Sequence, residues 1–472
     1  MKIVCSLFLI ITCFSFSQNK QLLFGFTEIP QSSLVNPAIK LHNEWFVGVP
    51  LLSHIHAQAG SSGANVYDVF SDDNQSFTNK LRSAVYSMSE NDFFSLNQQV
   101  ELFAGGFSYG DSFVKTDYIS FGLYQETDAI FYFPRDYAIL AFEGNQTNIG
   151  RSFDLGHLNV KGEVISVLHV GYAKQINKMF SVGIRGKIYS SVLNFNSINN
   201  RGSFITSNGQ NNFLRHDFNL DLEFQTSGLA SLTNDDNSDV NNDFKTIGKR
   251  ILFGGNLGLG FDIGLSYKLT DQWQLDASLL DVGFIRHSKD IENYKLEGEY
   301  TFEGINPIFP EAGEEQTAEE YWDEISDQFE DLFNVDSTNT TKYTTLRPVK
   351  LNAALSYSFG QKMDKECNCL SEESEYQNAL GMQLFAIKRP KGPQIALTAA
   401  YYRRLIKGLR VKTSWTADSY SLTNLGIGAV ANIGNVNLYF LADNLLKYGN
   451  LAKAQSVSLQ LGLNYTVKRN EN

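Results

Sequence analysis

Apolar and polar residues alternate strictly along several long stretches of this chain, and this pattern restricts its fold more than any other feature. In residues 457–467 every odd position is apolar, and the even positions are Ser, Gln, Gly, Asn and Thr. Residues 257–269 and 349–359 repeat the alternation. A period of two gives a β-strand one apolar face and one polar face. The chain is therefore predicted to be all-β.

A soluble β-sandwich also alternates, so other features must decide between a sandwich and a membrane barrel. The alternating runs reach the length of about 9–11 residues that a tilted strand needs to cross a bilayer. Aromatic residues make up 13% of the chain, and many stand near predicted strand ends, as in the girdles of outer-membrane barrels. These features favour a transmembrane antiparallel β-barrel, and a secreted sandwich remains the alternative.

The start of the chain predicts export. Lys2 precedes an apolar run over residues 3–14, and small residues stand at Ser15 and Ser17. This is the pattern of a secretory signal peptide, here residues 1–17. The remaining sequence has no apolar run of membrane-helix length. The formal net charge is −12 and no basic block occurs, so nucleic acid is not an expected partner.

Alternation and turn residues predict a barrel of about fourteen strands within residues 98–472, preceded by an N-terminal hatch or plug over residues 18–97. Short turns fall at one end, and two long loops, 195–255 and 285–347, fall at the other. This asymmetry is typical of bacterial barrels with both termini in the periplasm. The predicted strands are 98–108, 115–125, 129–143, 161–174, 180–194, 256–268, 273–284, 348–359, 379–388, 394–403, 408–416, 422–432, 435–443 and 455–467.

Several short motifs carry a family resemblance. The segment Asn36-Pro37-Ala38 follows the predicted cleavage site by about 20 residues, and further motifs stand at 278–285, 300–305, 442–446 and 461–465. In this order they resemble a Bacteroidota family of outer-membrane β-barrels of unknown function, which is similar to PorP/SprF-like proteins and to fatty-acid transporter (FadL-like) barrels. The resemblance implies an outer-membrane location and a barrel fold. It does not imply a cargo.

The alternation also predicts which charged side chains face the lumen. They are Glu163, His169, Arg185, Lys187, Asp262, Asp276, Lys350, Arg410 and Lys412. Such residues can line a permeation path or hold the hatch by ion pairs across the lumen. We favour the anchoring role, because a lining with both signs of charge suits a purely apolar cargo poorly.

Residues 311–336 form an acidic stretch that contains no Lys or Arg. Within it, apolar residues recur at helical spacing, which predicts an amphipathic helix in the second external loop. Its apolar face either caps the barrel mouth or docks a partner at the cell surface. The residues of this predicted face are Tyr321, Trp322, Ile325, Phe329 and Phe333.

Cys367 and Cys369 are the two cysteines that remain after signal removal. Two thiolates can hold a soft metal, but a structural zinc site normally has four ligands. A local disulfide or a pair of exposed thiols is the simpler interpretation. No metal or cofactor is therefore expected. No catalytic or nucleotide-binding motif occurs either, so the chain is not expected to be an enzyme.

Three functional hypotheses follow. The first is a non-enzymatic subunit or accessory of a larger cell-envelope complex for secretion, gliding or barrel assembly, with protein partners and outer-membrane lipids around it. The second is a FadL-like transporter of small hydrophobic molecules, whose hatch moves and whose wall opens at the glycine-rich strand 256–268. The third and most remote is an outer-membrane lipid enzyme.

Overall fold

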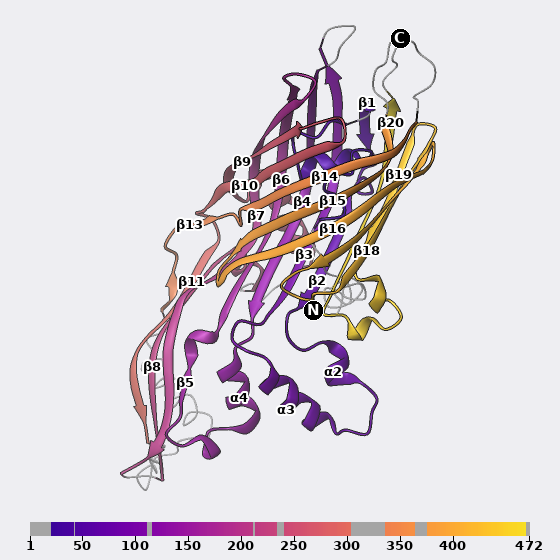
Figure 1. The fold of residues 1–472 in the computed structure, drawn as a ribbon. Helices are drawn as coiled ribbons and strands as arrows, with labels where there is room; N and C mark the ends of the chain where they lie inside the picture. The colour runs from indigo at the N-terminus through magenta and orange to yellow at the C-terminus, as the bar shows by residue number, and fades with distance from the viewer. Residues whose placement is uncertain are drawn as a thin grey trace.

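The computed structural model describes residues 20–41, 43–110, 116–210, 213–233, 240–303, 336–363 and 375–468. They form a closed antiparallel β-barrel of 14 strands (Figure 1), which confirms the predicted fold class. The wall consists, in order, of β1 (Asn43–Gly48) with β2 (Ile55–Ser61), β3 (Phe93–Tyr109), β4 (Asp117–Tyr132), β6 (Asn159–Gln175), β7 (Phe180–Asn208), β9 (Asn256–Lys268), β10 (Trp273–His287), β14 (Lys350–Met363), β15 (Glu375–Arg389), β16 (Gly392–Ile406), β17 (Leu409–Ala417), β18 (Asn424–Ile433), β19 (Val436–Ala442) and β20 (Ser456–Lys468).

The first wall strand is built from two pieces, β1 and β2. Both pieces pair with β20 on one side and with β3 on the other, so together they close the barrel. Residues 49–54 form a bulge between them, opposite Leu463 of β20. The predicted hatch boundary at residue 97 is therefore wrong, because the wall begins at Asn43. Each piece is too short to cross a bilayer alone, which is why the alternation did not reveal the strand.

The predicted strands 115–125 and 129–143 are also wrong. They are one continuous strand, β4, followed by the helix α4 (Arg135–Glu143). The polar residues Glu126, Thr127 and Asp128 imitate a turn in the sequence, but they pair in register with β3 and β6. One missed strand and one strand counted twice cancel, so the predicted total agrees with the structure.

The two ends of the barrel differ. At the short-turn end, β6 and β7, β9 and β10, β16 and β17, and β18 and β19 are joined by a few residues each. The long-loop end carries further elements in its connections: α2 (Val66–Phe70), α3 (Phe77–Ser87), α4, η2 (Gln146–Asn148), β5 (Ser152–Asp154), η3 (Leu155–His157), β8 (Leu214–Ser227), α5 (Ala230–Thr233), α6 (Val240–Lys249), η4 (Arg250–Gly254), β11 (Ile291–Phe302), β12 (Asp336–Asn339), β13 (Tyr343–Leu346), η5 (Leu445–Lys447) and η6 (Leu451–Lys453).

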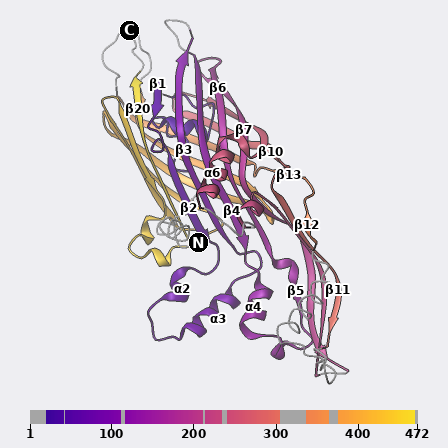
Figure 2. The same cartoon turned by 180° about the vertical axis from the view of Figure 1, so that it is seen from behind.

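A sheet projects beyond the wall at the long-loop end (Figures 1 and 2). β7 has 29 residues, about 95 Å at strand spacing, and its distal half pairs with β8, which pairs with β11. The regions 195–255 and 285–347, predicted as loops, therefore contain long strands. Helix α4 and strand β5 pack on one face of this sheet through an apolar cluster that includes Ile139, Phe153 and Phe204.

The outer face of the wall is apolar. Aliphatic side chains such as Ile184, Leu259 and Leu384 are exposed there. Near the short-turn end, exposed aromatic residues form ring contacts between neighbouring strands, as Trp45 does with Tyr465. An apolar belt with aromatic edges is the surface of an outer-membrane barrel. Among the described residues, no helix is both long enough and apolar enough to cross a membrane.

Candidate functional site in the barrel lumen

Residues 20–41, here called the inner segment, lie inside the barrel. The segment contains one short helical turn, η1 (Pro30–Leu34), and almost all its side chains are buried. Its contacts reach well-separated strands of the wall: Gln31 donates to Glu101 on β3, and Asn36 donates to the backbone of β9. The inner segment therefore fills the lumen and continues directly into β1.

The predicted hatch motif Asn36-Pro37-Ala38 lies against two glycines that face each other on neighbouring strands. Gly183 on β7 and Gly264 on β9 are register partners. A Cβ at Gly183 would lie 2.2 Å from the carbonyl oxygen of Pro37, and one at Gly264 would lie 2.2 Å from Asn36 Oδ1. The two missing side chains thus form the notch that holds the motif.

Three of the predicted lumen residues hold the inner segment. Arg185 donates to the carbonyl oxygens of Ser33 and Leu34, the latter at 3.2 Å. Lys412 donates to the carbonyl oxygens of residues 22 and 24, at 3.2 and 2.6 Å. Arg410 forms an ion pair with Glu28 at 2.9 Å. Three cations of the wall thus bind the backbone of the inner segment and its one carboxylate.

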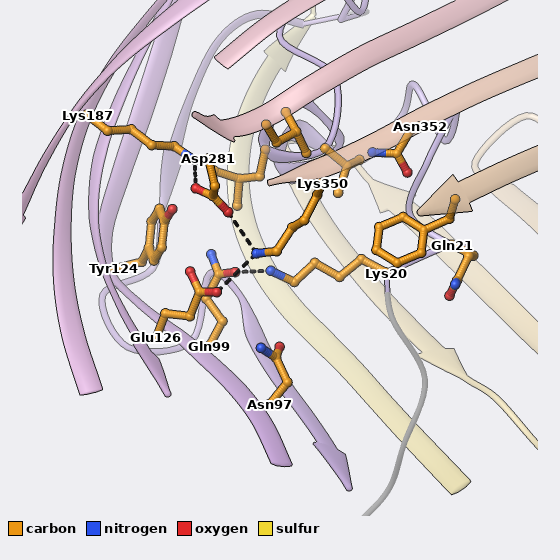
Figure 3. A pocket seen from close by; sticks show the side chains of 14 residues that line it. Lys20, Gln21, Asn97, Gln99, Tyr124, Glu126, Lys187, Asp281, Lys350 and Asn352 are labelled. Carbon is orange, nitrogen blue, oxygen red and sulfur yellow. Dashed lines mark hydrogen bonds and ion pairs between the residues drawn. The ribbon is translucent and has the colours of Figure 1, made fainter. Parts of the chain in front are cut away.

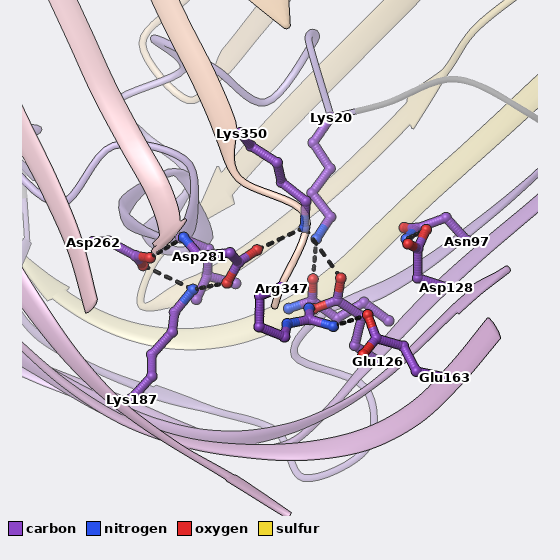
Figure 4. Close-up of polar contacts among 12 residues, drawn as sticks. Lys20, Asn97, Glu126, Asp128, Glu163, Lys187, Asp262, Asp281, Arg347 and Lys350 are labelled. Atoms are coloured by element: carbon purple, nitrogen blue, oxygen red, sulfur yellow. Dashed lines mark hydrogen bonds and ion pairs between the residues drawn. The ribbon is translucent and has the colours of Figure 1, made fainter. Parts of the chain in front are cut away.

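Other predicted residues form an ionic network with wall residues (Figure 4). Asp262 accepts from Arg185 at 3.2 Å and from Lys187 at 2.9 Å. Lys187 also lies 2.5 Å from Asp281, whose second oxygen lies 2.8 Å from Lys350. Buried ions are costly unless paired and hydrogen-bonded, and here each carboxylate has two cationic partners.

The network continues toward the long-loop end. Lys350 lies 3.1 Å from Glu126, and Arg347 lies between Glu126 and Glu163. The side chain of Arg347 is 1% exposed and is among the largest fully buried side chains. Lys20 of the inner segment donates to Gln99 beside this group. The network therefore joins six wall strands, β4, β6, β7, β9, β10 and β14, and reaches the start of the inner segment.

The remaining space in the lumen is small. One cavity of about 40 Å³ lies between Lys20, Tyr124, Glu126, Asp281 and Lys350 (Figure 3). A second, of about 30 Å³, shares part of this lining and extends to the β17–β18 loop at the long-loop end. Such volumes hold a few water molecules, whereas an engineered cavity that binds benzene has about 150 Å³. Neither of these two lumen cavities has room for a hydrophobic ligand.

An apolar cluster lies between the inner segment and one side of the wall. The segment contributes Leu22, Leu23, Phe24, Phe26, Ile29 and Val35, and the wall contributes Val430, Tyr439 and Leu441. Phe26 also meets the ring of Tyr402 edge to face at 5.7 Å. The lumen wall at β18 and β19 therefore presents an apolar patch, which the protein fills with its own side chains.

The other two predicted lumen residues are also buried. His169 lies beside the ring of Tyr124, with centroids 5.7 Å apart, and neither of its ring nitrogens has a hydrogen-bond partner among the described residues. Asp276 accepts two hydrogen bonds from Gln274, at 3.1 and 3.0 Å.

Sequence reasoning missed three central members of the network. Asp281 follows a one-residue shift in the β9–β10 ladder between Leu279 and Val282, so simple alternation points it the wrong way. Its positive φ of 59° was not visible in the sequence. Glu126 was placed in a turn, and Arg347 in a loop. The motif at 278–285 was the only available signal, because it surrounds Asp281.

Some predicted features lie outside the described residues. These are the signal peptide 1–17, the helix face Tyr321, Trp322, Ile325, Phe329 and Phe333, and the pair Cys367 and Cys369.

Comparison with known proteins identifies one matching family, described as a family of unknown function (DUF5723), over residues 37–443. No curated protein sequence matches. Among solved structures, the chain is similar to the toluene transporter TbuX of Ralstonia pickettii, with TM-score 0.42 and 10% identity, covering 96% of this chain and 98% of that one. It is also similar to a FadL homologue of Pseudomonas aeruginosa, with TM-score 0.41, 9% identity and coverage of 96% and 97%.

Proposed function

Because the chain belongs to the DUF5723 family, whose function is unknown, we propose a function from the lumen itself: a gated outer-membrane transporter of small hydrophobic molecules. This was the second hypothesis from the sequence. The observation that carries it is the apolar patch around Val430, Tyr439 and Leu441 on the lumen wall. The interior of a water-filled pore is polar, so an apolar patch on the lumen wall is not typical of such a pore.

In this proposal the inner segment is a plug that occupies the ligand site when no ligand is bound. Its Leu22, Phe24 and Phe26 cover the patch and leave only water-sized cavities. A hydrophobic molecule that replaces these side chains keeps the apolar area buried, so the exchange costs little hydrophobic free energy. The cations at Arg185 and Lys412 return the segment to its closed position.

The proposed direction follows from the asymmetry of the barrel. We assign the long-loop end to the cell exterior and the short-turn end, where β20 ends, to the periplasm, as in other bacterial barrels. The second cavity extends toward the long-loop end near Tyr420. A ligand thus enters beside the β17–β18 loop and leaves where the inner segment meets β1.

Uptake of the hydrophobic fluorophore N-phenyl-1-naphthylamine by intact Gram-negative host cells tests this function. Cells with the wild-type protein should take up the dye faster than cells without it, and Val430→Asn should abolish the gain by placing an amide in the patch. Val167→Asn is the matched control, because Val167 is equally buried on the opposite wall. Equal uptake with and without the wild-type protein would contradict the proposal.

A second candidate function is that of a subunit of a larger cell-envelope complex, and one observation favours it. The projecting sheet of β7, β8 and β11 extends far beyond what a membrane span requires, and such a platform suits a protein partner. Gentle detergent extraction of the tagged protein, followed by mass spectrometry of proteins and lipids, distinguishes the two. Stoichiometric partners support the subunit role; a lone barrel with a defined hydrophobic ligand supports transport.

A further inference from the structure

The apolar patch ends at a group of buried polar atoms on β17, β18 and β20 and on the residue that follows β19. Ser414 Oγ, Asn424 Oδ1, Asp443 Oδ2 and Ser458 Oγ have no hydrogen-bond partner within the described part of the chain. Their residues are at most 3% exposed. We call these four residues the polar end of the patch. Buried polar atoms are normally paired, so four neighbours without partners require a reason.

Register places these residues side by side on the lumen face. Ser414 pairs with Gly426 across β17 and β18, and the backbone N–H of Asp443 donates to the carbonyl oxygen of Ser458. A Cβ at Gly426 would lie 2.3 Å from Asp443 Oδ1 and 2.6 Å from Ser414 Oγ. The glycine thus lets a carboxyl and a hydroxyl group converge on one point.

The atom of the inner segment that faces this point is a carbon. Leu22 Cδ1 would lie 3.1 Å from the same Cβ position. On the next inward row, Phe26 lies over Gly428, beside Leu441. The segment therefore matches the apolar patch with apolar groups but presents a methyl group to the polar end, where nothing on it can hydrogen-bond.

We propose, on the basis of the proposed function, that the transported ligand is an apolar molecule carrying one neutral hydroxyl group, such as an alkylphenol. Its ring or chain takes the place of Phe26 and Leu22, and its hydroxyl group lies between Ser414 and Asp443. A hydroxyl group both donates and accepts, and the polar end offers acceptors in Asn424 and Asp443 together with serine hydroxyls that do either.

Charged head groups are disfavoured by the same surroundings. A carboxylate would approach the carboxyl group of Asp443. An ammonium group would lie near Lys412, the next inward-facing residue of β17. The Nζ of Lys412 donates to the carbonyl oxygens of residues 22 and 24. A charged head group of either sign also loses its hydration on entering this buried site, which costs far more than burial of a neutral hydroxyl group.

The discriminating experiment compares three probes that share a propyl-substituted ring: 4-propylphenol, propylbenzene and 4-propylbenzoate. Binding to the purified full-length protein is measured by equilibrium dialysis, after correction for partition into detergent. We expect 4-propylphenol to bind about 5- to 20-fold more tightly than propylbenzene, the gain of one to two buried hydrogen bonds. The benzoate should bind more weakly than both.

Variants test whether the polar end causes this preference. Ser414→Ala and Asp443→Asn should each reduce the ratio of phenol to hydrocarbon affinity by at least about 3-fold. Ser266→Ala is the matched control, because Ser266 accepts from Gln274 on the other side of the lumen. Its ratio should equal that of the wild type.

The possible failures are separable. If none of the probes binds, the proposed function and this inference both fail. If propylbenzene and 4-propylphenol bind equally well, the function stands and the hydroxyl preference is refuted. Tightest binding of the benzoate would also refute it, because a charged head group would then be the recognised feature.

Discussion

Replacement of Gly183 by alanine tests whether the inner segment is a plug. The new methyl carbon would lie 2.2 Å from the carbonyl oxygen of Pro37, 2.3 Å from its carbonyl carbon and 2.5 Å from the nitrogen of Ala38. These are backbone atoms and cannot rotate away. Gly183 itself is fixed, since β7 pairs with β6 and β9 on its two sides. The inner segment must therefore move.

Overpacking of this kind costs about 1–3 kcal/mol. If the cost falls on docking of the segment, the ratio of undocked to docked protein rises by about 5- to 150-fold. Single-channel recording in planar bilayers measures this ratio as the fraction of time in a conducting state. Gly183→Ala should raise that fraction strongly, while the heat-modifiable migration of the barrel in gels stays unchanged.

Gly186→Ala is the control on the same strand, because a Cβ there meets nothing within 4 Å. It should behave as the wild type does. If Gly183→Ala and Gly186→Ala show the same conducting fraction, the inner segment does not close the lumen at this notch, and the reasoning is refuted.

Two further substitutions have clear expectations. Arg347→Met leaves Glu126 and Glu163 without their shared cation, so the free energy of barrel unfolding should fall by about 3–5 kcal/mol. The gel shift that reports unfolding should then occur at a lower temperature. The control Arg201→Met, at an exposed position, should have no effect. Lys412→Met removes two charge-assisted bonds to the inner segment, worth about 1.5–3 kcal/mol each, and should raise dye uptake, while no change would show that this lysine does not hold the plug.

The barrel and most of its inward-facing charges were predictable, because a period of two determines both the strand and the face of each residue. Arg185, Lys187 and Asp262 lie inside for this reason alone. The alternation fails where the ladder shifts. The extra residue before Val282 turns Asp281 toward the lumen, and the residue types there do not predict such a shift.

Which charged residues pair with each other was harder to predict from the sequence than which of them face the lumen. Glu163 and Arg347 lie 184 residues apart in sequence, and their contact depends on where Arg347 follows the end of β13. The apolar cluster was hidden for another reason. Leu22, Leu23, Phe24 and Phe26 belong to a stretch too short and irregular to be read as a strand, and their partners lie on β18 and β19.

The inner segment and the closing strand of the barrel are one continuous stretch of chain. β1 and β2 form the seam between β3 and β20, and the segment that precedes them lies inside the wall. The last strand, β20, can complete the cylinder only by pairing with the strand that follows the plug. We therefore expect assembly to have an order, in which residues 20–41 enter the lumen before the seam closes. If β20 pairs with β1 and β2 too early, the inner segment is left outside the lumen.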